Sequence, residues 1–121
     1  QPVQILDYNL PAAGEEVVHT VPVELNNCLL YVYKGSVRIN DQDVTSHQCV
    51  RMDASTGTGE SRSFTITATT ADASVIVFSG ERLNEPIAWH GPFVMNTDAE
   101  IRATLREYST GTFLKKRASW D

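Results

Sequence analysis

Residues 28–40 read CLLYVYKGSVRIN. Cys28 to Tyr33 is apolar and aromatic, and this run has the length of a buried strand. Lys34-Gly35 predicts a tight turn, because glycine adopts the positive φ that such turns need. After the turn, Val37 and Ile39 alternate with polar residues and are expected to point inward. This segment therefore predicts two short strands joined by a turn.

The same alternation occurs on both sides of that segment. Upstream, one parity of a predicted strand holds Val17, His19, Val21, Val23 and Leu25, and Pro22 on the other parity indicates an edge or a bulge. Asp41-Gln42-Asp43 predicts a turn, and the polar residues 53–63 predict a loop. Downstream, Phe64, Ile66 and Ala68 alternate with threonines, and Val75 to Phe78 predicts a buried strand that Gly80 ends.

One helix is expected near the C-terminus. Thr97-Asp98-Ala99-Glu100 matches a capping box, and Ile101, Leu105 and Tyr108 follow at helical spacing. Gly111 supplies a stop, so the helix is expected to run from Asp98 to about Ser109. Several short strands followed by one helix predict a closed antiparallel sandwich or barrel.

Composition limits the class of protein. The 121 residues, 41% of them hydrophobic, suit a single domain over 1–121. The net charge of −5 argues against direct nucleic-acid binding, and the basic cluster Lys115-Lys116-Arg117 is expected to be a solvated tail. No apolar run approaches the roughly 20 residues of a membrane span. Cys28 and Cys49 lie in no Cys-x-x-Cys pattern, which favours reduced thiols in the cytoplasm.

Residues 78–97, FSGERLNEPIAWHGPFVMNT, closely resemble the C-terminal domain of the pirin family. The run Gly91-Pro92-Phe93-Val94-Met95-Asn96-Thr97 is a distinctive signature of that family. Residues 30–37 are similar to a hairpin of the same domain, and residues 113–120 are similar to pirin C-termini. The resemblance implies an all-β fold, the cupin double-stranded β-helix or small jelly-roll barrel, with one C-terminal α-helix.

The resemblance also separates this chain from the metal-bearing part of the family. Pirins usually have two cupin domains, and three His and one Glu in the N-terminal cupin bind the metal. Pirins are described as iron-binding proteins, as nuclear transcriptional co-regulators and as quercetin dioxygenases. This chain matches the other cupin, and a nuclear location is implied only by analogy.

The cupin motif places a His-x-His pair before a Glu and a Gly seven residues after that Glu. When Gly35 is aligned with the motif glycine, Cys28 falls at the Glu. The His pair then falls at Pro22 and Glu24, or at Val21 and Val23 for a longer spacing, and a later His falls near Phe64. Because none of these residues is a ligand that the motif needs, we predict no metal, no cofactor and no catalytic residue.

The three histidines do not form a metal-binding pattern. His19 lies on the apolar parity of its strand and is expected to be a hydrogen-bonded structural residue. His47 lies between polar turns and is expected to be exposed. His90 lies beside Trp89 and is expected to pack and to form hydrogen bonds.

The family-like segment concentrates large apolar residues, which predicts an interface. The candidate interface residues are Trp89, His90, Pro92, Phe93, Val94 and Met95. The expected partner is a second copy in a homodimer or a pirin N-terminal-type cupin. The alternative is that this segment seals one end of the barrel beneath the helix.

Three functions follow from these observations. The favoured one is a metal-free, non-enzymatic cupin module that acts through protein association. The second is a pirin or quercetinase-type dioxygenase, or half of one, with an unusual ligand set or a metal site supplied by an N-terminal cupin. The third is a small-molecule-binding barrel, which depends on whether Tyr31, Tyr33 and Phe64 leave the interior open.

Overall fold

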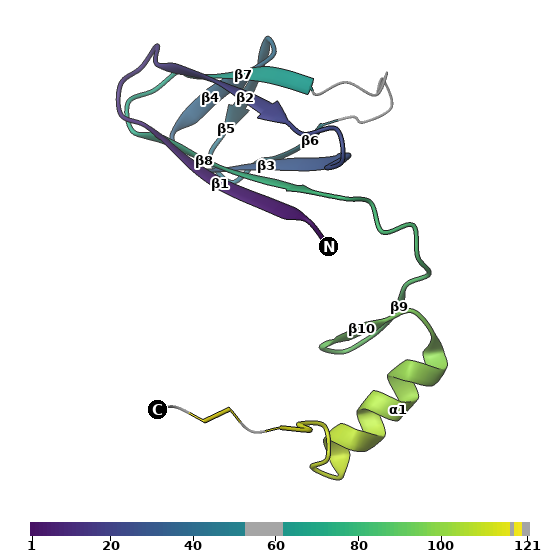
Figure 1. The fold of residues 1–121 in the computed structure, drawn as a ribbon. Helices are drawn as coiled ribbons and strands as arrows, with labels where there is room; N and C mark the ends of the chain where they lie inside the picture. The colour runs from purple at the N-terminus through teal and green to yellow at the C-terminus, as the bar shows by residue number, and fades with distance from the viewer. Residues whose placement is uncertain (53–61, 117, 120–121) are drawn as a thin grey trace. The chain divides into compact units, whose positions relative to one another are not determined.

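The computed structural model describes residues 1–52, 62–116 and 118–119. The chain groups into two compact units, Gln1–Arg82 and Leu83–Asp121 (Figure 1). That residues 1–121 form one domain stays a prediction.

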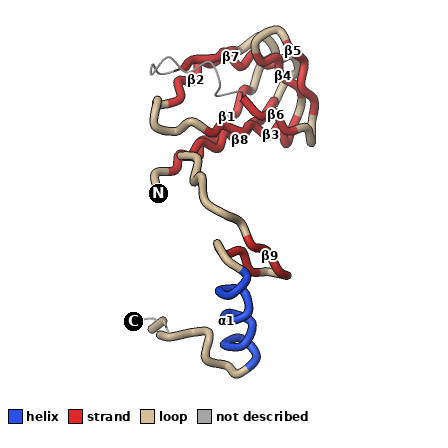
Figure 2. Tube along the Cα trace, turned by 90° about the vertical axis from the view of Figure 1, so that its right-hand side faces the viewer, coloured by secondary structure: helices blue, strands red, loops and turns tan. Residues whose placement is uncertain are grey.

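The first unit consists of two antiparallel sheets. Their strands are β1 (Val3–Leu10), β2 (Glu16–Val21), β3 (Asn27–Lys34), β4 (Ser36–Ile39), β5 (Gln42–Thr45), β6 (Cys49–Met52), β7 (Arg62–Ala68) and β8 (Ala73–Gly80). One sheet has the order β1-β8-β3-β6 and the other has the order β2-β7-β4-β5. Figure 2 shows these sheets as two layers within the first unit.

The core lies between these sheets because alternate side chains of each strand point to the same side. Most of its members are branched aliphatic residues, which pack well on a pleated surface. The side chains that are at most 3% exposed include Leu30, Val32, Val37, Ile39, Ile66, Val75 and Val77. The inward positions predicted for Val37, Ile39, Phe64, Ile66 and Ala68 are confirmed.

The chain crosses from one sheet to the other at Gly35, so the prediction of a hairpin at residues 30–37 is wrong. β3 lies between β8 and β6, whereas β4 lies between β7 and β5, so the chain leaves one sheet at Lys34 and enters the other at Ser36. Gly35 has a φ of 67°, and a Cβ there would lie 2.6 Å from Thr70 Oγ1. The Ser36 N–H donates a hydrogen bond to the same oxygen at 2.9 Å. A glycine is therefore needed both for its φ and for its missing side chain.

The strand expected to reach Leu25 ends earlier. β2 stops at Val21, because Pro22 has no N–H to donate to a neighbouring strand. Val23 is consequently 42% exposed, which corrects its predicted inward position, although Leu25 is buried as expected. The turn predicted at 41–43 lies one residue earlier, where Asn40 and Asp41 have φ values of 45° and 67°.

Other differences concern strands and a loop. β1, β5 and β6 were not predicted, and Phe78 in the predicted buried strand is 40% exposed. The predicted loop at 53–63 lies outside the described residues except for Arg62 and Ser63, which begin β7.

The second unit contains a short hairpin and the predicted helix. β9 (Ala88–His90) pairs with β10 (Phe93–Met95), and α1 (Asp98–Ser109) follows. Ala88 and Ile101 are buried in this unit. The Phe93 ring lies 5.7 Å from the ring of Tyr108 and 5.4 Å from the ring of Phe113, measured between centroids. These ring contacts, edge-on to Tyr108 and tilted to Phe113, join the hairpin to the helix and to the segment after it.

The predicted start of the helix is confirmed. Thr97 Oγ1 accepts a hydrogen bond from the Glu100 N–H, and the Glu100 carboxylate accepts one from the Thr97 N–H at 2.9 Å. These two bonds form a capping box, which satisfies N–H groups that have no partner inside the helix.

The predicted stop at Gly111 is also confirmed. Gly111 has a φ of 71°, and its N–H donates to the Tyr108 carbonyl at 3.2 Å. The Thr112 N–H donates to the Glu107 carbonyl at 2.8 Å. This pair of bonds is a Schellman motif, which needs a residue with positive φ after the last turn.

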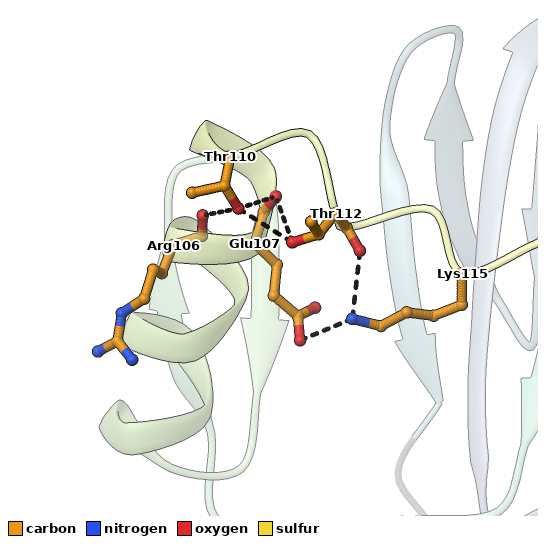
Figure 3. Close-up of polar contacts among 5 residues, drawn as sticks. All are labelled: Arg106, Glu107, Thr110, Thr112 and Lys115. Atoms are coloured by element: carbon orange, nitrogen blue, oxygen red, sulfur yellow. Dashed lines mark hydrogen bonds and ion pairs between the residues drawn. The ribbon is translucent and has the colours of Figure 1, made fainter.

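Hydrogen bonds and an ion pair of side chains further stabilise the end of the helix, as Figure 3 shows. Thr110 Oγ1 donates to the Arg106 carbonyl at 2.9 Å, and Thr112 Oγ1 lies 2.9 Å from Thr110 Oγ1. Lys115 Nζ lies 2.7 Å from a carboxylate oxygen of Glu107 and donates to the Thr112 carbonyl at 3.2 Å. Lys115 therefore lies against the helix end, so the cluster predicted to be a solvated tail begins with an ion-paired lysine.

Candidate functional site

Three positions aligned with cupin metal ligands surround one pocket. Val21 ends β2, Cys28 lies near the start of β3, and Phe64 lies near the start of β7. The pocket has a volume of about 210 Å³, and its other lining residues are Asn40, Met52, Arg62 and Ser63. Of the positions that the alignment on Gly35 selected, Val21, Cys28 and Phe64 line this pocket, whereas Pro22, Val23 and Glu24 do not.

The floor of this pocket is apolar. Val21 and Cys28 are each 2% exposed, and Phe64 is 5% exposed. The Ser79 hydroxyl donates to Cys28 Sγ at 3.5 Å. Burial raises the pKa of the Cys28 thiol, and the Ser79 hydrogen bond and the positive charge of Arg62 act in the opposite direction. Because burial is the largest of these effects, the thiol stays neutral at pH 7.

These residues do not fit the iron site that pirins carry in their other cupin. Such a site needs neutral imidazoles and a carboxylate, and Val21 and Phe64 have no atom that binds a metal. Among the described residues, no group of three or more His, Cys, Asp or Glu side chains is arranged to hold a metal ion.

His19 lies deeper in the same unit and is 2% exposed. Its Nδ1 is 2.8 Å from the Tyr8 hydroxyl, so it is hydrogen-bonded as predicted. Its ring centroid lies 5.2 Å from that of Phe64. Burial lowers the pKa of His19, because the charged imidazolium loses its hydration in this position.

The other two histidines lie at the surface. His47 is exposed as predicted and has a φ of 68°. His90 is also exposed, which corrects its predicted packing, and it is the Cα partner of Phe93 in the short hairpin.

The predicted interface residues divide between two faces of the hairpin. Trp89 and Val94 are Cα partners on one face, where they are 75% and 63% exposed. Phe93 and Met95 lie on the other face and are half-buried, and Pro92 and His90 are exposed. Phe93 packs within the second unit, where its ring contacts Tyr108, whereas Trp89 and Val94 form an exposed apolar pair. The alternative that this segment seals one end of the barrel stays a prediction.

A second exposed apolar surface was missed by the sequence analysis. Val3 and Ile5 on β1 are 66% and 61% exposed, and Ile5, Phe78 and Leu29 lie opposite one another across three strands. Val3 and Ile5 have the same parity, and the inward parity of this strand holds Leu6 and Leu10. The burial of side chains alternates along β1, but the sequence does not reveal it, because apolar residues occur at both the inward and the outward positions.

The two tyrosines that could have filled the barrel do not line the pocket. Tyr31 and Tyr33 have the parity opposite to Leu30 and Val32 on β3 and are half-buried. The Tyr33 hydroxyl donates to the Asp7 carboxylate at 2.8 Å. Of the three bulky residues in question, only Phe64 lines the pocket.

Comparison with known proteins identifies the fold and its relatives. A sequence model described as the pirin C-terminal cupin domain matches residues 5–114. A Vibrio cholerae protein, provisionally named a quercetin 2,3-dioxygenase, is 32% identical over 93% of this chain and 36% of its own length. A pirin-like protein of Solanum lycopersicum is 31% identical over 91% of this chain and 36% of its own length.

A crystal structure also resembles this chain in both fold and sequence. The structure titled quercetin 2,3-dioxygenase from Acinetobacter baumannii superposes with a TM-score of 0.80 and 32% identity, covering 93% of this chain and 36% of that chain. The expected cupin fold of two antiparallel sheets with one C-terminal helix is thereby confirmed. The chain spans about a third of the length of these relatives. In the described residues, the helix is too short and too polar to cross a membrane.

Proposed function

Because the chain belongs to the pirin family, as a C-terminal cupin domain, we propose that it is a metal-free cupin module that acts through association with another protein. The residues of the pocket support the first part of this proposal. Val21, Cys28 and Phe64, which the cupin motif aligned on Gly35 matches with metal ligands, form an apolar floor. A barrel built in this way gains stability from packing where a catalytic cupin keeps a polar site.

The exposed apolar residues support the second part. The hairpin presents Trp89 and Val94, and the outer face of the first sheet presents Val3, Ile5 and Phe78. Large exposed apolar residues that lie together mark surfaces that another protein covers. The partner we propose is a second copy of this chain, or a pirin N-terminal-type cupin when one is present.

Light scattering after size exclusion tests this proposal across a range of concentrations. We expect the mass of two chains, decreasing toward one chain on dilution. Val94→Ser should weaken the association, whereas Val18→Ser should not. Val18 is a matched control because it has the same 63% exposure and lies on β2.

Two results together would contradict the proposal. One is the mass of a single chain at every concentration. The other is failure to form a complex with the separately produced N-terminal cupin of a pirin. If Val18→Ser weakened the association as strongly as Val94→Ser, the chain would still associate, but the hairpin would be rejected as the surface through which it does so.

A second candidate is half of a two-domain dioxygenase. It is favoured by the names of two relatives, one provisionally named and one titled quercetin 2,3-dioxygenase, and this chain spans 36% of the length of each. Oxygen uptake with quercetin separates the two functions. An association module should take up no oxygen by itself. Half of an enzyme should begin to take up oxygen when a metal-bearing N-terminal cupin is added.

We also propose the cytoplasm as the location. Cys28 and Cys49 are both free thiols in the structure, and free thiols persist in reducing compartments.

A further inference from the structure

We propose that β1 of one copy of this chain pairs with β1 of a second copy, antiparallel and about a two-fold axis that passes beside Leu6. The inference rests on the proposed association with a second copy, and it names a contact for that association in addition to the hairpin. Three features of β1 support it. They are its long regular edge, the direction of its charged side chain and the order of residues along its outer face.

β1 is an outer strand of its sheet and is drawn in purple in Figure 1. Among the described residues of the first unit it pairs only with β8, and this pairing is regular from Val3 to Leu10. Successive residues of a strand direct their backbone N–H and C=O groups to opposite sides. Every second residue of β1 therefore offers both groups to a further strand. The edge is eight residues long and contains no proline, lysine or bulge.

The other sheet edges of this unit are shorter. β5 and β6 have four described residues each, and a short strand offers few groups for pairing. β2 has six residues and begins with the exposed Glu16. Proteins usually keep long regular edges paired or covered, because such edges otherwise recruit other chains. The edge of β1 is therefore the one in this unit that best fits a partner strand.

The charged residue of β1 points away from this edge. The Asp7 carboxylate accepts hydrogen bonds from the Tyr33 hydroxyl at 2.8 and 3.0 Å. Tyr33 lies on β3, which is separated from β1 by β8. The carboxylate therefore extends across β8 and does not project from the edge, where charged groups commonly prevent strand pairing.

The residues along β1 favour one register. Two copies related by a two-fold axis keep their core faces on the same side when the axis passes beside a residue. An axis at Asp7 would place two carboxylates opposite each other, which is destabilising. An axis at Ile5 would shorten the pairing. An axis at Leu6 pairs residues 3–9 of both copies and places Ile5 of each copy opposite Asp7 of the other.

Charge variants at Ile5 test both the contact and its register. Ile5 is 61% exposed on the outer face, so these variants should fold like the wild type. Ile5→Lys would place an ammonium opposite Asp7 of the second copy in two symmetry-related pairs, and should lower the Kd of the dimer roughly fivefold. Ile5→Glu would place a carboxylate there and should raise the Kd by a similar factor. Light scattering over a dilution series measures both values.

Val18→Lys and Val18→Glu are the matched controls. Val18 is 63% exposed and lies on β2, for which no pairing between copies is proposed. These variants change the net charge in the same way as the Ile5 variants, so they should leave the Kd unchanged. Urea unfolding verifies that all four variants are folded.

Amide hydrogen exchange locates the contact in the full wild-type chain. Amides that point to a free edge exchange rapidly, whereas amides within a strand pair are protected. We expect every second amide of β1 to be protected at concentrations above the Kd and to lose this protection on dilution. Amides of β8 should not respond, because β8 is paired on both sides by β1 and β3.

Each other outcome rejects the strand contact. An unchanged Kd for both Ile5 variants, an equal response to the Val18 variants, or protection of β1 that does not depend on concentration excludes it. A higher Kd for both Ile5→Lys and Ile5→Glu excludes the register at Leu6. The mass of a single chain at every concentration also rejects the contact.

The strand contact and the proposed function can fail separately. If the Ile5 variants have no effect and Val94→Ser still weakens the dimer, the strand contact is rejected and association through the hairpin stands. If Ile5→Lys and Ile5→Glu act in opposite directions and Val94→Ser has no effect, the strand contact stands and the hairpin is rejected as an interface.

Discussion

The His19 imidazole is buried, and its two nitrogens have different surroundings. Nδ1 bonds to the Tyr8 hydroxyl, whereas Nε2 has no hydrogen-bond partner among the described residues. Tyr8 from β1 and Phe64 from β7 face the ring. A buried ring with an unpaired nitrogen resists taking up a proton, because the added charge would be neither hydrated nor paired.

This environment makes stability depend on pH. The pKa of His19 is lowered in the folded chain from its usual 6.5. As the pH falls below 6.5, the unfolded chain binds a proton that the folded chain does not, so the free energy of unfolding decreases. We expect urea unfolding to show a lower midpoint at about pH 5.5 than at about pH 7.5, and His19→Leu to lose much of this difference.

His47 provides the control for this prediction. It is exposed, so His47→Gln should keep the wild-type pH dependence. If His19→Leu and the wild type lost stability equally between the two pH values, groups other than His19 would cause the effect.

Gly35 is the residue at which both conformation and space restrict substitution. We expect Gly35→Ala to lower the free energy of unfolding by about 2 kcal/mol or more, from left-handed strain and from a clash with Thr70 Oγ1. Gly14→Ala should cost only about 1 kcal/mol, since Gly14 has a φ of +89° and open space around it. Equal losses in chemical denaturation would show that the close approach to Thr70 has no energetic effect.

At single positions, the sequence predicted residues of the pocket floor but not the charged residue that also lines the pocket, Arg62. Cys28 and Phe64 were located by their spacing from a turn glycine, which the fold preserves. Arg62 was assigned to a polar loop, because a strand that starts with a charged residue cannot be distinguished from the loop before it. Only the register with Val21 shows that Arg62 points inward.

Among the elements, the helix was predicted with its observed bounds because its ends depend on local chemistry. Thr97 and Glu100 bond to each other three residues apart, and Gly111 ends the last turn. β1, β5 and β6 depend instead on distant partners. β1 pairs with β8 about 70 residues away, and no local pattern reveals such a pairing.

The helix start has a measurable contribution. We expect Thr97→Ala to reduce the free energy of unfolding by about 1 kcal/mol, because the Glu100 N–H loses its acceptor. Thr97→Ser keeps a hydroxyl and should stay close to the wild type. Calorimetry or denaturant unfolding of the three chains measures this, and equal stability of Thr97→Ala and the wild type would mean that solvent replaces the cap.

For the whole molecule, the fold was predicted through family resemblance more than through strand counting. Local patterns gave a barrel or sandwich, and the segment at residues 78–97 selected the cupin. The crossing at Gly35 shows why counting was insufficient, because consecutive strands were expected to pair and instead belong to different sheets. The exposed face of Val3, Ile5 and Phe78 also needed the assembled sheet to become visible.

The last prediction concerns metal content and oxygen chemistry of the entire chain. We expect elemental analysis after expression with added iron and zinc to find far less than one metal ion per chain after dialysis against a chelator. The reason is that Val21, Cys28 and Phe64 lack the imidazoles and the carboxylate of a cupin site. We further expect no oxygen uptake with quercetin, because activating dioxygen requires a redox metal or cofactor. A full-length pirin with three His and one Glu in its N-terminal cupin, prepared in the same medium, is the positive control for metal loading. Metal bound near one ion per chain that survives the chelator would overturn this prediction, and Cys28→Ser would then show whether the thiol is a ligand.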